Sequence, residues 1–329
     1  MGYSNTSLVQ KLGTQTMKDS GATQGLQLSN LAIRGLSFLV NLDASTGSAV
    51  TVNAAIEALE RVRVNIDGAD DFNMKGSSLY YLNRWMMDGN EVPNATNGTN
   101  LTRNVGLYLP FEYESGVKSQ DTVLDLRPRA NGSLPQAYVQ FYTDLPTNNV
   151  GSIDVYEHYY TFANKQRKTA FRKQIIEKTL TVTAGGSFII PIDYGATPDD
   201  IARMMIYTKN ASGVLQTPTL RSIKLSASEG QQYDVFDVDG IENTDYTGIQ
   251  WVFNKMAPVN DDLDGVTLIS FGPDNSRGQE SKLSGVLDAS DMTNLTLSGV
   301  AGAAGEMTVL LERVGVGKNP TADPYSGNK

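Results

Sequence analysis

The two halves of the sequence carry the same series of strand-like and helix-like runs in the same order. Four elements recur with offsets of 154–166 residues in a chain of 329 residues. The matched pairs are Arg61–Val64 with Arg221–Lys224, Leu107–Leu109 with Thr267–Ile269, Trp85 with Trp251, and Ile153 with Met307. Recurrence at one long period is typical of a duplicated structural unit, and the length suits two domains. We therefore expect one type of domain to occur twice.

The repeated runs have the alternating pattern of half-buried β-strands. Val62, Val64 and Ile66 alternate with two arginines and an asparagine, so one face of this strand is apolar and the other is polar. Clusters of turn-forming residues separate the runs, and Asp67–Asp71 has the composition of a hairpin turn. The sequence therefore predicts an all-β fold.

One helix-like stretch interrupts the strands of each half. In the first half, Leu79, Leu82 and Met86 share one helical face, and the serines at 77–78 can cap the N-terminus. In the second half, residues 244–255 have the same period. We expect each β-domain to contain one short helix.

The domain boundaries follow from composition. Residues 1–30 are polar, with only scattered leucine and methionine, and so favour an arm outside the core. The expected parts are an N-terminal arm at 1–30, a first β-domain at 31–164, a basic linker at 165–174, a second β-domain at 175–316 and a C-terminal tail at 317–329.

Composition argues against most catalytic classes. The chain has no cysteine and a single histidine, His158, which excludes thiol nucleophiles, cysteine-ligated metals and histidine-rich metal sites. His158 lies in a tyrosine-rich run, where a packing or hydrogen-bonding role is favoured over catalysis. A net charge of −9 argues against broad nucleic-acid binding, and no apolar run reaches 18 residues. We expect a binding or structural protein with no catalytic residue and no cofactor.

One acidic loop is a weak candidate for a structural calcium ion. Asn260, Asp262 and Asp264 supply oxygen ligands at alternate positions, and Gly265 follows them. A calcium loop of the helix–loop–helix type also needs a bidentate glutamate at its twelfth position, where this chain has Phe271. An ordinary surface turn is therefore the favoured interpretation, and calcium at this loop is the alternative.

The stretch between the halves carries five positive charges and no acid. Three interpretations remain open: a solvated connector, which is favoured, a contact with lipid headgroups or a partner protein, and a contact with nucleic acid. The basic side chains are Lys165, Arg167, Lys168, Arg172 and Lys173.

The stretch Leu59–Gly68, with a valine–arginine–valine strand, a following Asp-Gly turn and then a short helix, resembles a known family. It is similar to the double jelly-roll major capsid proteins of icosahedral bacteriophages with an internal membrane, of the corticovirus and tectivirus kind. A weaker copy of the motif runs from Ile223–Leu225 to Phe236–Gly240. The likeness extends over the two-domain plan from Leu31 to about Val316.

This resemblance implies two tandem jelly-roll β-sandwiches in one chain. It further implies a homotrimer with pseudo-hexagonal outline, packed against neighbouring capsomers and minor capsid proteins over an internal membrane surface. The expected location is the virion capsid, made and assembled in the host cytoplasm. Residues 1–30 hold Lys11, Lys18 and Asp19, and this low charge suits a shell with no direct contact to nucleic acid.

Two other functions are consistent with the same residues. A carbohydrate-binding or fibre-like β-sandwich adhesin is favoured by the aromatic run Tyr156–Phe162 and by the Asn/Thr-rich loops. A jelly-roll glycoside hydrolase needs only two carboxylates and no sequence motif, and is less favoured. Neither explains why a tryptophan-bearing helical stretch occurs once in each half.

Overall fold

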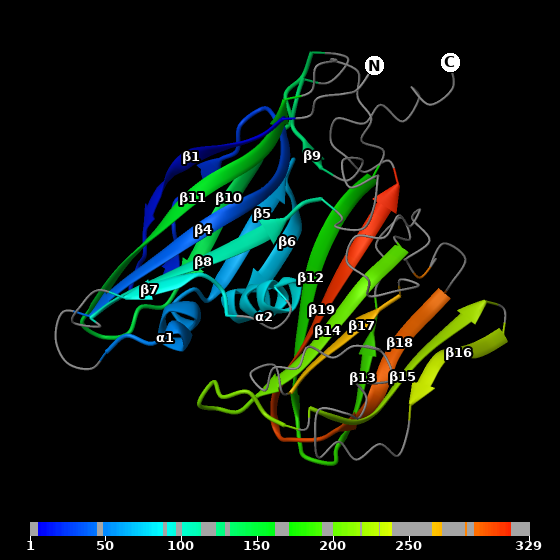
Figure 1. Ribbon diagram of the computed structural model, residues 1–329. Helices are drawn as coiled ribbons and strands as arrows, with labels where there is room; N and C mark the ends of the chain where they lie inside the picture. The colour runs from blue at the N-terminus through cyan, green and yellow to red at the C-terminus, as the bar shows by residue number, and fades with distance from the viewer. Residues whose placement is uncertain are drawn as a thin grey trace. The chain divides into compact units, whose positions relative to one another are not determined.

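A computed structural model shows two β-sandwich units (Figure 1). The structure describes residues 6–44, 49–87, 91–96, 101–112, 123–128, 132–161, 171–192, 200–217, 219–229, 231–238, 265–271, 287 and 293–316. The first unit comprises Met1–Ile175 together with Val316–Lys329, and the second is Ile176–Gly315.

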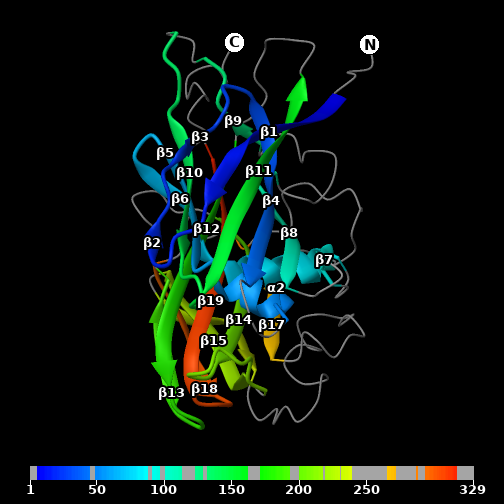
Figure 2. The same ribbon diagram turned by 90° about the vertical axis from the view of Figure 1, so that its left-hand side faces the viewer.

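In the first sheet of the first unit, the last long strand of the unit, β11, pairs with its first strand, β1. Its strands run in the order β1-β11-β4-β8-β7, with β9 beside β4, and every pairing is antiparallel. Figure 2 shows β1, β11, β4 and β8 side by side. The strands are β1 (Thr6–Thr16), β4 (Ala32–Ala44), β7 (Asn94–Thr96), β8 (Thr102–Pro110), β9 (Leu124–Asp125) and β11 (Asn149–Thr161).

The second sheet of this unit runs in the order β6-β5-β10-β2, with β3 also beside β10. Its strands are β2 (Gly21–Ala22), β3 (Leu26–Gln27), β5 (Arg61–Ile66), β6 (Ala69–Lys75) and β10 (Ala137–Thr143). The two sheets pack face to face. Phe38 of the first sheet meets Phe141 of the second edge-on, with ring centroids 5.2 Å apart. Both rings are about 1% exposed or less, as expected for the centre of a sandwich.

The second unit is a sandwich of the same kind. One sheet runs β17-β14-β19-β12 and the other β13-β18-β15-β16. Its core is a cluster of buried aliphatic side chains from both sheets, including Ile206, Val309, Ile223 and Leu297. The strands are β12 (Phe171–Val182), β13 (Ser187–Pro191), β14 (Asp200–Lys209), β15 (Leu220–Glu229), β16 (Gln231–Val238), β17 (Val266–Ser270), β18 (Thr293–Ala301) and β19 (Gly305–Val316).

The two units share one strand topology. If β2 with β3 is counted as one strand and the short strands β7 and β9 are set aside, the described part of each unit has eight strands in chain order. In both units the first sheet joins strand one to eight, eight to three and three to six. The second sheet joins two to seven, seven to four and four to five. This is the jelly-roll arrangement, so the predicted pair of tandem jelly rolls is confirmed.

The offsets found in the sequence fall on equivalent strands. The run at Arg61 lies on β5 and its partner on β15, which are strand four of each unit. The runs at Leu107 and Ile153 likewise correspond to β17 and β19. Trp251 lies outside the described residues, as does the whole predicted helix at 244–255.

The N-terminal segment was predicted as an arm outside the core, and the structure differs. Thr6–Thr16 is β1, the first strand of the first jelly roll, and pairs with β11 along its length. Met17 and Leu28, which follow it, are 4% and 3% exposed. The polar composition was misleading because backbone pairing and polar contacts, rather than apolar burial, hold this edge strand to the sheet.

The predicted basic linker at 165–174 also differs at its C-terminal end. Strand β12 begins at Phe171, so residues 171–174 belong to a strand. Lys173 is only 2% exposed, and its Nζ donates to the backbone oxygen of Glu112. The basic residues concealed the start of this strand from sequence analysis, because they indicate a solvated segment. A long lysine side chain can nevertheless be buried along its aliphatic part while its amine reaches a carbonyl oxygen. Residues 165–170 lie outside the described part of the chain.

Among its described residues the first unit has two helices, α1 (Val52–Glu57) and α2 (Gly76–Met86). Leu79 and Leu82 are buried on α2 as predicted, but the helix starts at Gly76, so the serines at 77–78 lie inside its first turn instead of capping it. A Cβ at Gly76 would lie 2.2 Å from the backbone oxygen of Leu59, so only glycine fits at this helix start. The sequence did not predict α1, which Thr51 caps through its hydroxyl.

A buried carboxylate fixes β1 and the following segment to β11. Glu157 is fully buried, and its two oxygens accept from the backbone N–H of Ser29 at 2.7 Å and from the Gln10 amide at 2.9 Å. On the opposite face of β11, Asp154 pairs with Lys11 at 2.8 Å in a more exposed position. The fully buried carboxylate of Glu157 is therefore satisfied by two donors, which come from β1 and from the segment that follows it.

Replacing Glu157 with alanine is expected to lower the free energy of unfolding by about 1–3 kcal/mol, because the Ser29 N–H and the Gln10 amide lose their buried acceptor. Hydrogen exchange of the β1 amides should accelerate. Asp154→Ala, on the same strand but on its outer face, is the matched control and should cost less. Equal losses in denaturant titrations of the two variants would show that Glu157 does not anchor β1.

Candidate functional site

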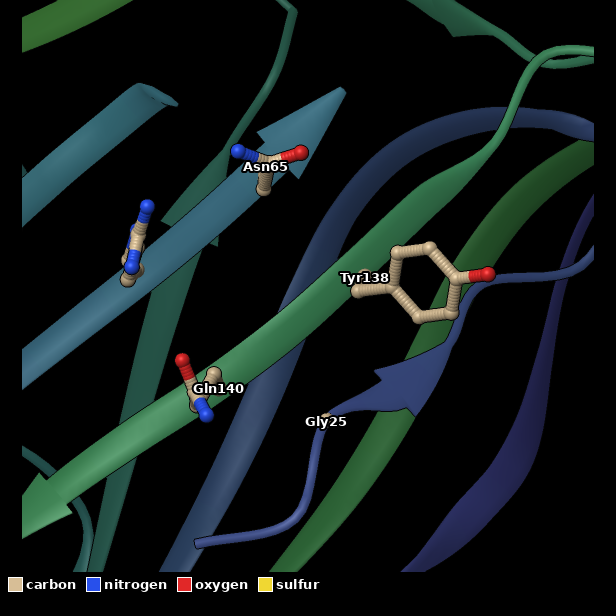
Figure 3. Close-up of a pocket in the computed structure, with 5 residues that line it drawn as sticks. Gly25, Asn65, Tyr138 and Gln140 are labelled. Atoms are coloured by element: carbon tan, nitrogen blue, oxygen red, sulfur yellow. The ribbon is translucent and has the colours of Figure 1, made fainter. Parts of the chain in front are cut away.

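A polar pocket of about 250 Å³ opens on the outer face of the second sheet of the first unit. It is lined by Gly25, Arg63, Asn65, Tyr138 and Gln140. Figure 3 shows that Asn65 lies on β5, that Tyr138 and Gln140 lie on β10, and that Gly25 lies on the segment beside β10. The pocket therefore spans two adjacent strands and the chain that crosses next to them.

Strand alternation places these side chains on the surface. Val62 and Val64 of β5 point into the core and are fully buried, which turns Arg63 and Asn65 outward. On β10 the fully buried Val139 separates Tyr138 from Gln140 in the same way. The polar side chains of the pocket therefore lie on the outer face of the same strands whose inner face forms the core.

The charge of Arg63 is matched within the site. Its Nε donates to Asp70 Oδ1 at 2.6 Å, and this hydrogen bond raises the pKa of the guanidinium above its usual value. Asn65 donates to the same oxygen at 2.8 Å, and Gln140 donates its amide hydrogen to the backbone oxygen of Thr23 at 2.9 Å. The pocket is therefore ordered by hydrogen bonds and carries no net charge.

The single histidine has a structural environment, as the sequence predicted. His158 Nε2 lies 2.6 Å from the Ser37 hydroxyl, and the ring of Tyr108 contacts the imidazole edge-on with centroids 5.4 Å apart. Burial and then the nearby Arg34 guanidinium lower the pKa of His158, whereas Glu112 acts in the opposite direction. The imidazole is therefore held neutral near pH 7 and acts as a packing and hydrogen-bonding group.

An ion pair next to His158 is also satisfied internally. Arg34 Nε donates to Glu112 Oε1 at 2.8 Å, and the Tyr160 hydroxyl donates to Glu112 Oε2 at 2.9 Å. Burial, reinforced by the Glu112 charge, raises the pKa of Tyr160 to about 12. Each charged group has its partner, so this cluster joins β4, β11 and the segment after β8 rather than providing a free acid or base.

The other predicted site residues fall into two groups. Lys173 is buried and is removed from any contact surface, and Arg172 lies on β12. Lys165, Arg167 and Lys168 lie outside the described residues, as does the calcium candidate of Asn260, Asp262 and Asp264. Within the ranges that the structure describes, no group of three acidic, histidine or cysteine side chains could hold a metal ion. The predicted hairpin turn is present at Asp67 and Gly68, both with positive φ, and the rest of the Asp67–Asp71 stretch belongs to β6.

The pocket itself was missed from the sequence. The alternation in Ala137–Thr143 could have shown that Tyr138 and Gln140 share the outer face of a strand. Nothing in the sequence places Gly25 next to them, because the pairing of β3 with β10 joins residues more than a hundred positions apart.

Comparison with solved structures shows which fold this is. The chain is similar to the major capsid protein of Sulfolobus turreted icosahedral virus, with a TM-score of 0.65 and 14% sequence identity, covering 98% of this chain and 99% of that one. It is similar to the major capsid protein P2 of bacteriophage PM2, with a TM-score of 0.61 and 13% identity, covering 96% and 100%. The chain has the double jelly-roll fold of these capsid proteins.

A third solved structure, of the PBCV-1 virus capsid, agrees with a TM-score of 0.59 and 13% identity over 95% of this chain and 94% of that one. No protein-family model and no curated protein sequence matches the chain. The likeness is thus one of fold, with little sequence in common. No helix in the described ranges has the length and apolar character needed to cross a membrane.

His158 should titrate below pH 6.5 in the folded chain, because burial and Arg34 disfavour the imidazolium. As the only histidine, it gives a single imidazole signal in an NMR pH titration. Since the folded pKa is lowered, its contribution to stability is present above pH 6.5 and is lost as the pH falls through the folded pKa. Arg34→Gln should raise the midpoint, while Lys11→Gln should leave it unchanged. A midpoint at or above 6.5 in the unaltered chain contradicts this account.

Proposed function

We propose that the chain is a structural major capsid protein that forms trimers and assembles an icosahedral shell over an internal lipid membrane. The observation that carries this proposal is the match of both jelly rolls, over nearly the whole chain, to major capsid proteins. These matches cover 99% and 100% of the other two chains.

The duplicated topology gives the physical reason for a trimer. A chain with two equivalent sandwiches forms a ring of six when three copies associate, and such a ring tiles a hexagonal lattice with few distinct contacts. Subunit contacts would bury apolar surface at their centres, and their polar rims would set the register. No catalytic residue takes part in such a role, and the proposal is not that of an enzyme.

We propose further partners for such a coat protein. They are neighbouring capsomers, minor capsid proteins and the membrane surface, with the protein made in the host cytoplasm and located in the virion capsid. The net charge of −9 supports a shell that does not touch nucleic acid directly. Lys165, Arg167, Lys168 and Arg172 are the basic side chains that we assign to contact with lipid headgroups or a partner protein.

Static light scattering of the purified full chain should give three times the chain mass of 35.6 kDa. The value should hold on dilution through the micromolar range, because an obligate coat trimer buries a large interface. A stable monomer at micromolar concentration would contradict the proposed coat function, whereas the jelly-roll fold would stand.

A further inference from the structure

The pocket on β5 and β10 combines three kinds of recognition group on one wall. Tyr138 is 38% exposed as a residue and lines the pocket, so its aromatic side chain is accessible to a ligand. Gln140 donates one amide hydrogen to the backbone oxygen of Thr23, and Figure 3 shows its side-chain oxygen turned toward β5, where it can accept. Arg63 uses Nε on Asp70 and Nη1 on Tyr142, which leaves Nη2 as a donor. An aromatic face, an acceptor and a donor therefore line one small space.

The electrostatics of the pocket favour a neutral ligand. Asp70 lies 2.6 Å from Arg63 and also accepts from Asn65, so the guanidinium charge is already matched. An anion bound here would meet the Asp70 carboxylate as well as the arginine. A ligand rich in hydroxyl groups suits the site better, because each hydroxyl both donates and accepts.

Gly25 keeps the pocket open. Its backbone does not adopt the left-handed conformation that requires glycine elsewhere in the chain, so a turn does not explain the residue. A Cβ built at Gly25 would lie 3.7 Å from the Cβ of Tyr138, an ordinary van der Waals distance. A larger residue would therefore fit the backbone, and its side chain would fill the space beside the tyrosine ring.

We propose that this pocket binds one pyranose ring of a neutral saccharide. The apolar C–H face of the sugar packs on Tyr138, and its hydroxyls bond to Gln140 and Arg63. The volume of about 250 Å³ is below the range of pockets for drug-sized ligands, which fits a ligand of one sugar ring. This binding site is independent of the proposed coat function.

Saturation-transfer NMR on the full chain tests the proposal with two sets of probes. One is a panel of methyl hexopyranosides, and the other is neutral polysaccharide such as dextran or mannan. Tyr138→Ala should weaken binding by about three- to tenfold through loss of the ring face. Gly25→Leu should abolish binding by filling the pocket. Tyr156→Ala, on the outer face of the other sheet, is the matched control and should bind normally.

A monosaccharide site is supported if saturation transfer to a free methyl glycoside is seen in the unaltered chain and is lost in both pocket variants. Transfer to polysaccharide alone, lost in the same variants, supports a pocket that binds one ring of a longer saccharide. The proposal is overturned if no probe shows transfer, or if transfer persists unchanged in both variants while their circular dichroism is native. Displacement of the bound sugar by inorganic phosphate would also overturn the proposal, since it would show that the pocket is an anion site.

Discussion

The fold of the first unit depends on β11, the long strand that lies between β1 and β4. It joins the first strand of the unit to the third through pairings that span more than a hundred residues. Fully buried Ile153, Val155 and Glu157 on its inner face supply both core packing and the acceptor that holds β1. β19 has the same position between β12 and β14, so each unit closes only when its final strand pairs. Such closure is entropically costly because it joins residues far apart in the sequence, and the packing of the interior must compensate for this cost.

Polar groups on the sheets are mostly satisfied inside their own unit. Arg34, Glu112 and Tyr160 form one closed set, and Arg63, Asn65 and Asp70 form another. Outward faces of this kind present ordered, nearly neutral surfaces instead of reactive groups. Such surfaces suit contact with further protein copies or with a small neutral ligand. A role of this kind needs no reactive side chain, which agrees with a sequence that has no cysteine and a single histidine.

Strand alternation follows from a two-sided sheet and the regular offset follows from duplication, and together they were enough to predict one type of β-domain occurring twice. The jelly-roll topology was implied only by the resemblance of Leu59–Gly68 to a known family. The structural role of His158 followed from its tyrosine neighbours. β1 and the start of β12 were not predictable, because edge pairing and a buried lysine leave no apolar signature in the sequence. The pocket was hidden for another reason: Gly25 and Tyr138 meet only through long-range pairing of β3 with β10.

The central claim is that one chain supplies two equivalent jelly rolls to a shell. Electron cryomicroscopy of assemblies of the full chain, at a resolution that separates sandwiches, tests it most directly. The account predicts capsomers of three chains with six β-sandwiches in a ring, arranged on a hexagonal lattice. Capsomers of another symmetry, or density in which the two halves of a chain are unlike folds, would contradict it.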